Sequence, residues 1–272
     1  MGNTPYSNAF LSHEVEDHLD SHLDMQEFCT VDRGLTGKPG TKRIINVYTA
    51  TEGTENLGLG QGNTKTIMVS AVPKEYEILT AQNRFEYYDE EEDADPMMVV
   101  NGAALAADDM FNHINADIYG EFSKATLSHT ADVPNFSAFV STVALLNLEE
   151  AQKIKLFGFV NAADHAAVQE ALKDDLKYVE SVVRSGYIGT VAGVHLYLKK
   201  NATKGEIVIG SKEAVTLFVK KGVHVEHTCR QLNNRSAEDA NIRKNTLFTR
   251  KNYIAALTNA TRAAKLRISP ST

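Results

Sequence analysis

The sequence predicts an α+β protein, and three observations carry this prediction. The first is a glycine-rich stretch, because residues 34–62 hold seven of the chain's 17 glycines between two short strand-like runs. The second is a helical repeat of apolar residues from Val100 to Phe122. The third is a second half in which short helix-like and strand-like runs alternate, as they do in a compact α/β unit.

Composition sets broad limits on the class of protein. The chain has 272 residues, 43% apolar and 23% charged, which is ordinary for one large globular domain or two modest ones. Two cysteines give neither a disulfide framework nor zinc-finger spacing, so a reducing, cytosolic origin is expected. Residues 1–20 lack the pattern of a signal peptide, and no apolar run has the length of a membrane span.

The net charge of −7 conceals an asymmetry between the two ends of the chain. Residues 1–29 carry six acidic residues and no Lys or Arg, whereas residues 230–272 carry nine basic residues and two acidic ones. The two ends could pair within a subunit or head to tail between subunits, and two solvated faces remain the alternative. The overall acidity argues against a dedicated nucleic-acid-binding protein.

The first third of the chain predicts a helix and then a ribbon. Leu11, Val15, Leu19 and Leu23 recur every four residues, and Ser12 suits the cap of this amphipathic helix. Strand-like runs at 43–48 and 66–70 predict a long two-stranded ribbon with a glycine-rich tip. Such a ribbon is marginal alone in water, because it buries too little apolar surface to offset its ordering cost. It therefore suggests a subunit built for assembly.

The middle of the chain predicts strands within residues 73–88 and then a helix of roughly six to seven turns. Six acids within residues 89–95 come directly before this helix. They lack the spacing of an EF-hand, so we expect a solvated run that favours the positive end of the helix, with Pro96 in its first turn. In the second half we expect helices after Pro134 and at 162–172. Strands are expected at 156–160, 207–209, 215–219, 223–229 and 246–257, with the chain closing near residues 263–266.

This order of elements resembles that of the HK97-like major capsid proteins of tailed bacteriophages. Four segments carry the resemblance along nearly the whole chain: residues 31–40, residues 85–89 with 95–96 and the long helix, residues 185–194, and residues 250–257. The resemblance implies the following division: N-terminal arm 1–30, extended E-loop hairpin 31–72, peripheral domain with a long spine helix 73–134, axial domain 135–244, and a return to the peripheral domain at 245–272.

The resemblance also implies a function. The chain would be a structural protein and not an enzyme, with no cofactor or metal, and would self-assemble through hexamers and pentamers into an icosahedral head. That head would enclose double-stranded DNA without sequence-specific binding. It would be assembled in the bacterial cytoplasm, with scaffolding, portal and decoration proteins as further partners and no membrane. Two sets of residues are expected at subunit interfaces: the acidic arm residues Glu14, Glu16 and Asp17, and Leu57 and Leu59 near the ribbon tip.

Two other functions are weighed against this one. An encapsulin-like protein compartment shares the fold but encloses enzymes. A metal-dependent enzyme would need His18 with His22, or His224 with His227, as ligands. Strand alternation puts His224 and His227 on opposite faces, which argues against a shared metal. Residues 58–63 begin like a dinucleotide-binding loop but lack its third glycine and open no helix.

Overall fold

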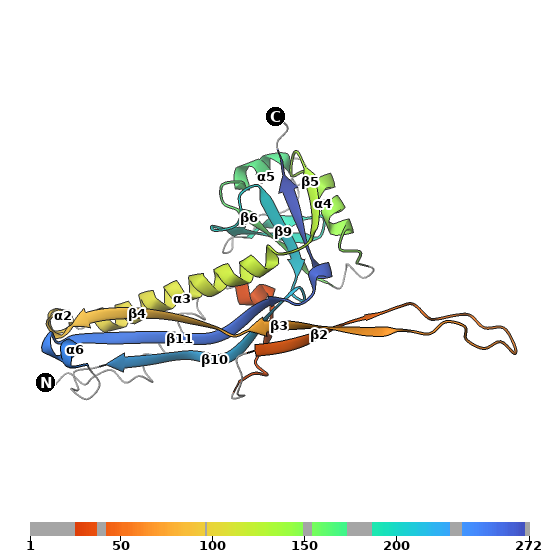
Figure 1. Ribbon diagram of the computed structural model, residues 1–272. Coiled ribbons are helices and arrows are strands. Elements are labelled where there is room, and N and C mark those ends of the chain that lie inside the picture. The colour runs from red at the N-terminus through yellow and green to blue at the C-terminus, as the bar shows by residue number, and fades with distance from the viewer. Residues whose placement is uncertain are drawn as a thin grey trace.

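The computed structural model describes residues 25–36, 42–95, 97–148, 154–172, 187–228 and 236–269. The chain forms an elongated unit, a compact unit at one end of the long helix, and a thin ribbon that projects away from both (Figure 1). Helices and mixed sheets are both present, so the predicted α+β class is confirmed.

The elongated unit is a four-stranded sheet in the order β1-β10-β11-β4. Its strands are β1 (Thr30–Asp32), β10 (Val215–Thr228), β11 (Lys244–Leu257) and β4 (Leu79–Tyr88). β10, β11 and β4 run antiparallel, while β1 is parallel to β10. β11 is paired on both sides, and its side chains are mostly buried.

The predicted long helix is α3 (Met98–Phe122), and it lies along this sheet (Figure 1). Small residues on one face of α3 let the helix approach the sheet closely. A Cβ atom on Gly102 would lie only 2.4 Å from Cε1 of Phe85 on β4. Ala103 and Ala107, one and five positions further on, are fully buried in the same contact. The helix is therefore held by close packing of its small-residue face.

The acidic run before α3 forms a helix of its own, α2 (Asp89–Ala94), where the sequence predicts a solvated run. The carboxylate of Glu91 accepts the backbone N–H of Tyr88 at 2.9 Å, and Asp89 accepts the side-chain amide of Asn245 at 2.7 Å. Arg243 forms a 3.2 Å ion pair with Glu90. Acidic residues suit the first turn of a helix, where backbone N–H groups lack partners. A short α6 (Ala237–Asn241) precedes β11 nearby.

The compact unit is a six-stranded mixed sheet in the order β5-β12-β9-β6-β8-β7. Its strands are β5 (Leu127–Ala131), β12 (Ala263–Ile268), β9 (Glu206–Ser211), β6 (Leu156–Asn161), β8 (Val194–Lys199) and β7 (Tyr187–Val191). Its helices are α4 (Phe136–Ala144) and α5 (His165–Ala171), and the short η3 (Ala260–Arg262) leads into β12. The buried face packs Phe139, Val160 and Ile209 into one apolar cluster.

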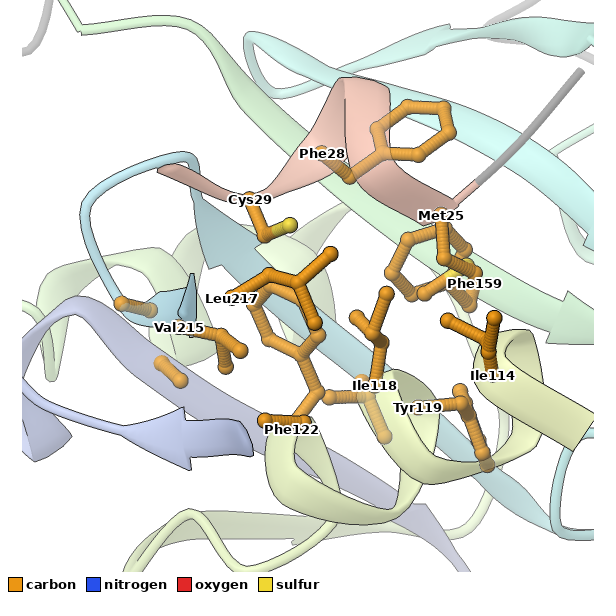
Figure 2. Close-up of a cluster of buried hydrophobic side chains, with 14 of the residues drawn as sticks. Met25, Phe28, Cys29, Ile114, Ile118, Tyr119, Phe122, Phe159, Val215 and Leu217 are labelled. Carbon is orange, nitrogen blue, oxygen red and sulfur yellow. The ribbon is translucent and has the colours of Figure 1, made fainter. Parts of the chain in front are cut away.

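The two units share a hydrophobic junction, which Figure 2 shows. The short helix η1 (Met25–Phe28) packs on the same apolar cluster as α3, and the backbone N–H of Met25 donates to Oδ1 of Asn115 on α3 at 2.9 Å. The Phe28 ring meets the rings of Phe157, Phe159 and Tyr197 edge-on, at centroid distances of 5.0, 5.2 and 4.7 Å. The N-terminal end of the described chain therefore fastens the long helix to the compact sheet.

Two strands join sheets on the other side of a predicted domain boundary, while the domain division itself stays a prediction. Residues 215–228 fall inside the predicted axial domain, but as β10 they pair with β11 in the elongated sheet. Residues 263–268 were expected with the peripheral domain, but as β12 they pair with β5 and β9 in the compact sheet. β10 pairs with the next strand along the chain, whereas β12 pairs with strands that are distant in sequence, and local patterns reveal neither choice of sheet. The two runs predicted at 215–219 and 223–229 are also one strand, interrupted by irregular register between Val219 and His224.

The close approach at Gly102 generates a stability prediction. Gly102→Ala forces the Phe85 ring to shift, and overpacking of this kind costs about 1–3 kcal/mol. Gly120 on the same helix is the matched control, because a Cβ there meets nothing within 4 Å. Gly120→Ala should be neutral or stabilising by about 0.5–1 kcal/mol. Urea unfolding followed by circular dichroism measures both, and equal midpoints for the two variants would contradict the packing described here.

Candidate functional site

The projecting ribbon, residues 42–77, is the candidate functional site. Its strands are β2 (Lys42–Ala50) and β3 (Val69–Glu77), which pair antiparallel from Lys42 opposite Glu77 to Ala50 opposite Val69. Residues 51–68 form the tip beyond this ladder, well away from the rest of the chain (Figure 1). The predicted ribbon is present, although its second strand begins at Val69, three residues later than the expected start at residue 66.

Hydrogen bonds across the tip continue the pairing beyond the strands. The N–H of Thr51 donates to the carbonyl oxygen of Met68 at 3.1 Å, and the N–H of Met68 donates to Oγ1 of Thr51 at 3.0 Å. Further out, Glu55 accepts both the hydroxyl of Thr64 at 2.7 Å and its N–H at 3.0 Å. These two hydrogen bonds hold the pKa of the Glu55 carboxyl below its usual value, and the bond from the Thr64 hydroxyl has the larger effect.

The end of the ribbon is a tight turn over residues 58–61. The N–H of Gln61 donates to the carbonyl oxygen of Gly58 at 3.1 Å, and Gly60 has a φ of 82°. A turn with positive φ at its third residue favours glycine, which explains one of the glycines noted in the sequence. The turn leaves Leu59 completely exposed, with its whole side chain in solvent.

Apolar side chains on the ribbon face water. Every residue of β3 is exposed except Tyr76, which is half-buried. Among the ribbon side chains that the structure describes, the large apolar ones that are exposed are Ile44, Leu57, Leu59, Ile67, Met68, Val69 and Val72. Single exposed apolar residues are common, but a series along one projecting element marks a surface that binds something else. An isolated two-stranded ribbon is at best marginally stable in water, so the exposed apolar side chains described here favour contact with another surface.

The base of the ribbon is attached to the elongated sheet. The hydroxyl of Tyr76 donates to the carbonyl oxygen of Leu257 on β11 at 3.4 Å, and burial raises the pKa of Tyr76. The guanidinium of Arg43 lies 5.8 Å from the centroid of the Phe218 ring on β10. Tyr76 also packs against the small buried cluster of Leu35, Phe218, Ile254 and Ala256. The ribbon is thus anchored at one end and open along the rest of its length.

Helix α4 carries a second exposed apolar surface that the sequence analysis missed. Phe136 and Val140 are exposed, as are Val133 before the helix and Leu145 after it. Phe139 and Thr142 are the fully buried residues of α4. The sequence did contain a sign of this surface. A helix that is buried on one side needs only a single apolar stripe, whereas α4 has apolar residues around more of its circumference.

The predicted interface residues have different outcomes. Leu57 and Leu59 lie on the ribbon tip and are exposed, so they are available for contact, and their interface role stays a prediction. Glu14, Glu16 and Asp17 lie outside the described residues, as do His18, His22 and Cys229.

The geometry does not support the metal-enzyme alternative for the second histidine pair. Nε2 of the buried His227 lies 2.6 Å from the hydroxyl of Tyr87, whereas His224 is more exposed and lies 3.5 Å from Glu226. Within the described ranges, no group of three or more His, Cys, Asp and Glu side chains is placed to hold a metal ion. Among the helices described, none has both the length and the apolar character needed to cross a membrane.

Comparison with known proteins identifies the architecture. No family model and no curated protein sequence matches the chain. Solved structures do match over most of its length. The capsid of the cyanophage P-SCSP1u gives a TM-score of 0.63 at 12% identity, covering 90% of this chain and 87% of that one. The fold is the HK97-like capsid fold.

Other solved structures with this fold come from different kinds of particle. The capsid of Ralstonia phage GP4 gives a TM-score of 0.65 at 7% identity, covering 90% of this chain and 88% of that one. A virus-like particle from Pyrococcus furiosus gives a TM-score of 0.61 at 12% identity, covering 94% of this chain and 97% of that one. The predicted resemblance is therefore confirmed at the level of the fold, across nearly the whole chain.

The hydrogen bonds of Glu55 generate a pH prediction for the ribbon tip. Because they lower its pKa in the folded tip, the stability they contribute is present above the unfolded pKa of 4.5 and is lost as the pH falls through the lower folded value. The Thr64 amide resonance should therefore titrate in NMR spectra with a midpoint below 4.5. Glu55→Gln should remove that titration, and an unchanged titration in this variant would show that another group causes it.

Proposed function

We propose that the protein is a major capsid protein that self-assembles into the icosahedral head of a tailed bacteriophage. The observation that carries this proposal is the ribbon, which exposes large apolar side chains at Ile44, along its tip and on β3, where every residue except Tyr76 is exposed. A neighbouring subunit would cover these side chains, because burying apolar area contributes about 25 cal/mol per Å². The HK97-like fold supports this reading.

The remaining parts of the proposal follow the predicted division of the chain. Residues 1–30 would be the arm, residues 31–72 the loop that lies on a neighbour, and the compact unit would meet its copies in hexamers and pentamers. Glu14, Glu16 and Asp17 would contact a neighbour through the arm. Scaffolding, portal and decoration proteins would be further partners in the host cytoplasm and the virion. Neither enzymatic activity nor a cofactor belongs to this function.

The proposed content of the particle is double-stranded DNA. A net charge of −7 suits a container that holds DNA without binding it tightly, because tight phosphate binding requires clustered basic residues. A protein compartment that encloses enzymes is the second candidate, because such a shell would share the fold. Shell formation is common to both candidates, so only the content separates them.

Negative-stain electron microscopy of the full chain, expressed alone, tests shell formation. Closed shells, tubes or rings of subunits are expected. Nuclease-protected double-stranded DNA inside native particles would then identify a phage head, whereas protein cargo would identify a compartment. Small monodisperse species, unchanged after a scaffolding partner is supplied, would overturn the proposal.

Leu59 at the ribbon tip provides the sharpest single-residue test. Leu59→Asp should impair assembly while leaving the subunit folded, because burying a leucine side chain is worth about 1.5–3 kcal/mol at each contact. The concentration needed for assembly should rise by at least about tenfold. Light scattering measures assembly, and a thermal melt of free subunits checks the fold.

Asn63→Asp is the matched control for this test, because Asn63 is exposed on the same tip and the variant adds the same charge without removing an apolar side chain. It should assemble nearly as the parent does. Normal particles from Leu59→Asp, or equal defects in the two variants, would count against a buried tip contact.

A further inference from the structure

A hollow beside η1 is lined by aromatic and basic side chains. It has a volume of about 200 Å³ and lies where η1, α3 and β8 meet. Phe28, Phe111 and Phe159 contribute aromatic surface to its wall, and Lys199 and Lys200 at the end of β8 contribute two positive charges. Among the described residues that line it there is no carboxylate. The hollow therefore suits a short segment with both apolar and acidic side chains.

The two lysines differ in their surroundings. The Nζ of Lys199 lies 5.8 Å from the centroid of the Tyr119 ring on α3, so part of this side chain packs on the helix. Lys200 is exposed and forms no ion pair with any residue in the described part of the chain. A carboxylate placed in the hollow could therefore form an ion pair with Lys200, whose charge no acidic residue of the described structure neutralises.

The chain itself supplies a segment of that chemistry at this position. Residues 1–24 contain five carboxylates and no Lys or Arg, and they join the described chain at Met25, which is one of the residues that line the hollow. Asp20 and Asp24 are spaced i, i+4, as are Leu19 and Leu23. In the helix that the sequence predicts, this spacing puts the two acids on one side and the two leucines on an adjoining one.

We propose that residues 19–24 of the same chain occupy the hollow, with Asp20 and Asp24 on Lys199 and Lys200 and the leucines against Phe111 and Phe159. Chain length favours the same copy, because Asp20 is at most about 18 Å of extended chain from Met25. This inference does not depend on shell formation. It differs from the expectation that the acidic segment pairs with the basic residues at 230–272. It also leaves Glu14, Glu16 and Asp17, further from the anchor, for contact with a neighbour.

Carbodiimide coupling of the purified full chain tests the contact, because it joins a carboxylate to an amine only where the two groups meet. Mass spectrometry should find Asp20 or Asp24 linked to Lys199 or Lys200. Glu27 lies on the same tryptic peptide, residues 1–33, so fragment spectra must assign the linked carboxylate. Lys155 and Lys212 line a second hollow that Phe28 also borders, and they act as internal controls. Links only to those lysines or to residues 230–272, or no links, would overturn the proposal.

A mixture of isotope-labelled and unlabelled chains, refolded together, tests whether one copy supplies both groups. Linked peptides should be wholly labelled or wholly unlabelled. A predominance of mixed pairs would mean that a second copy fills the hollow, and the same-chain assignment would be wrong.

A pair of lysine variants provides an independent measurement. Lys200→Glu should speed removal of residues 1–24 by a broad protease roughly two- to fivefold, which is the effect of losing one exposed ion pair. Lys204→Glu is the matched control, because Lys204 is also exposed on the compact unit but lies outside the hollow. Equal cleavage rates for the two variants would overturn the proposal, and thermal melts confirm that both remain folded.

Discussion

The packing of Phe28 is the interaction on which the arrangement of the two units depends. Its ring meets three aromatic rings of the compact sheet, and the preceding Met25 is hydrogen-bonded to Asn115 on the long helix. The same core includes Ile118 and Phe122 from the helix and Leu217 from the elongated sheet (Figure 2). Because protein interiors are close-packed, four segments that meet in one core cannot shift independently. The elongated and compact units therefore behave as one body at this point, and the ribbon is the part that stands outside it.

The path of the chain reinforces this junction. β10 and β11 belong to the elongated sheet, yet β9 before them and β12 after them belong to the compact sheet. The chain therefore passes from one unit to the other and back, and each sheet is completed by strands from distant parts of the sequence. Such long-range pairing is slow to form, since the entropy of closing large loops is lost before the contacts are made. It also means that neither unit is a continuous segment that could be removed without breaking the other.

Sequence patterns predicted the local elements well and their partners poorly. The helix over 98–122 was predictable, because its apolar repeat follows from contacts within one face of one helix. The ribbon was predictable from its glycines and flanking strand-like runs. The assignment of β10 and β12 to their sheets was not, because it depends on which strands come together in space. The exposed face of α4 was missed for the same reason: Phe136 and Val140 look like core residues until the position of the sheet is known. For the ribbon, the sequence also indicated an exposed tip at Leu57 and Leu59, while the anchors at its base, Arg43 and Tyr76, became apparent only with the fold.

Because the ribbon is attached only at its base, a small rotation there moves its tip by a large distance. A strand residue advances about 3.4 Å, so the ladder and tip together extend on the order of 50 Å beyond the Tyr76 anchor. A rotation of about 10° at that anchor would displace Leu59 by about 9 Å, with little change in the ladder itself. In a closed shell, five-fold and six-fold clusters present neighbours at different angles. A ribbon with a small pivot and a long arm can follow that difference without altering the core at Phe28. One sequence can then occupy positions that are not related by exact symmetry, because the adjustment is concentrated in the few contacts around Arg43 and Tyr76.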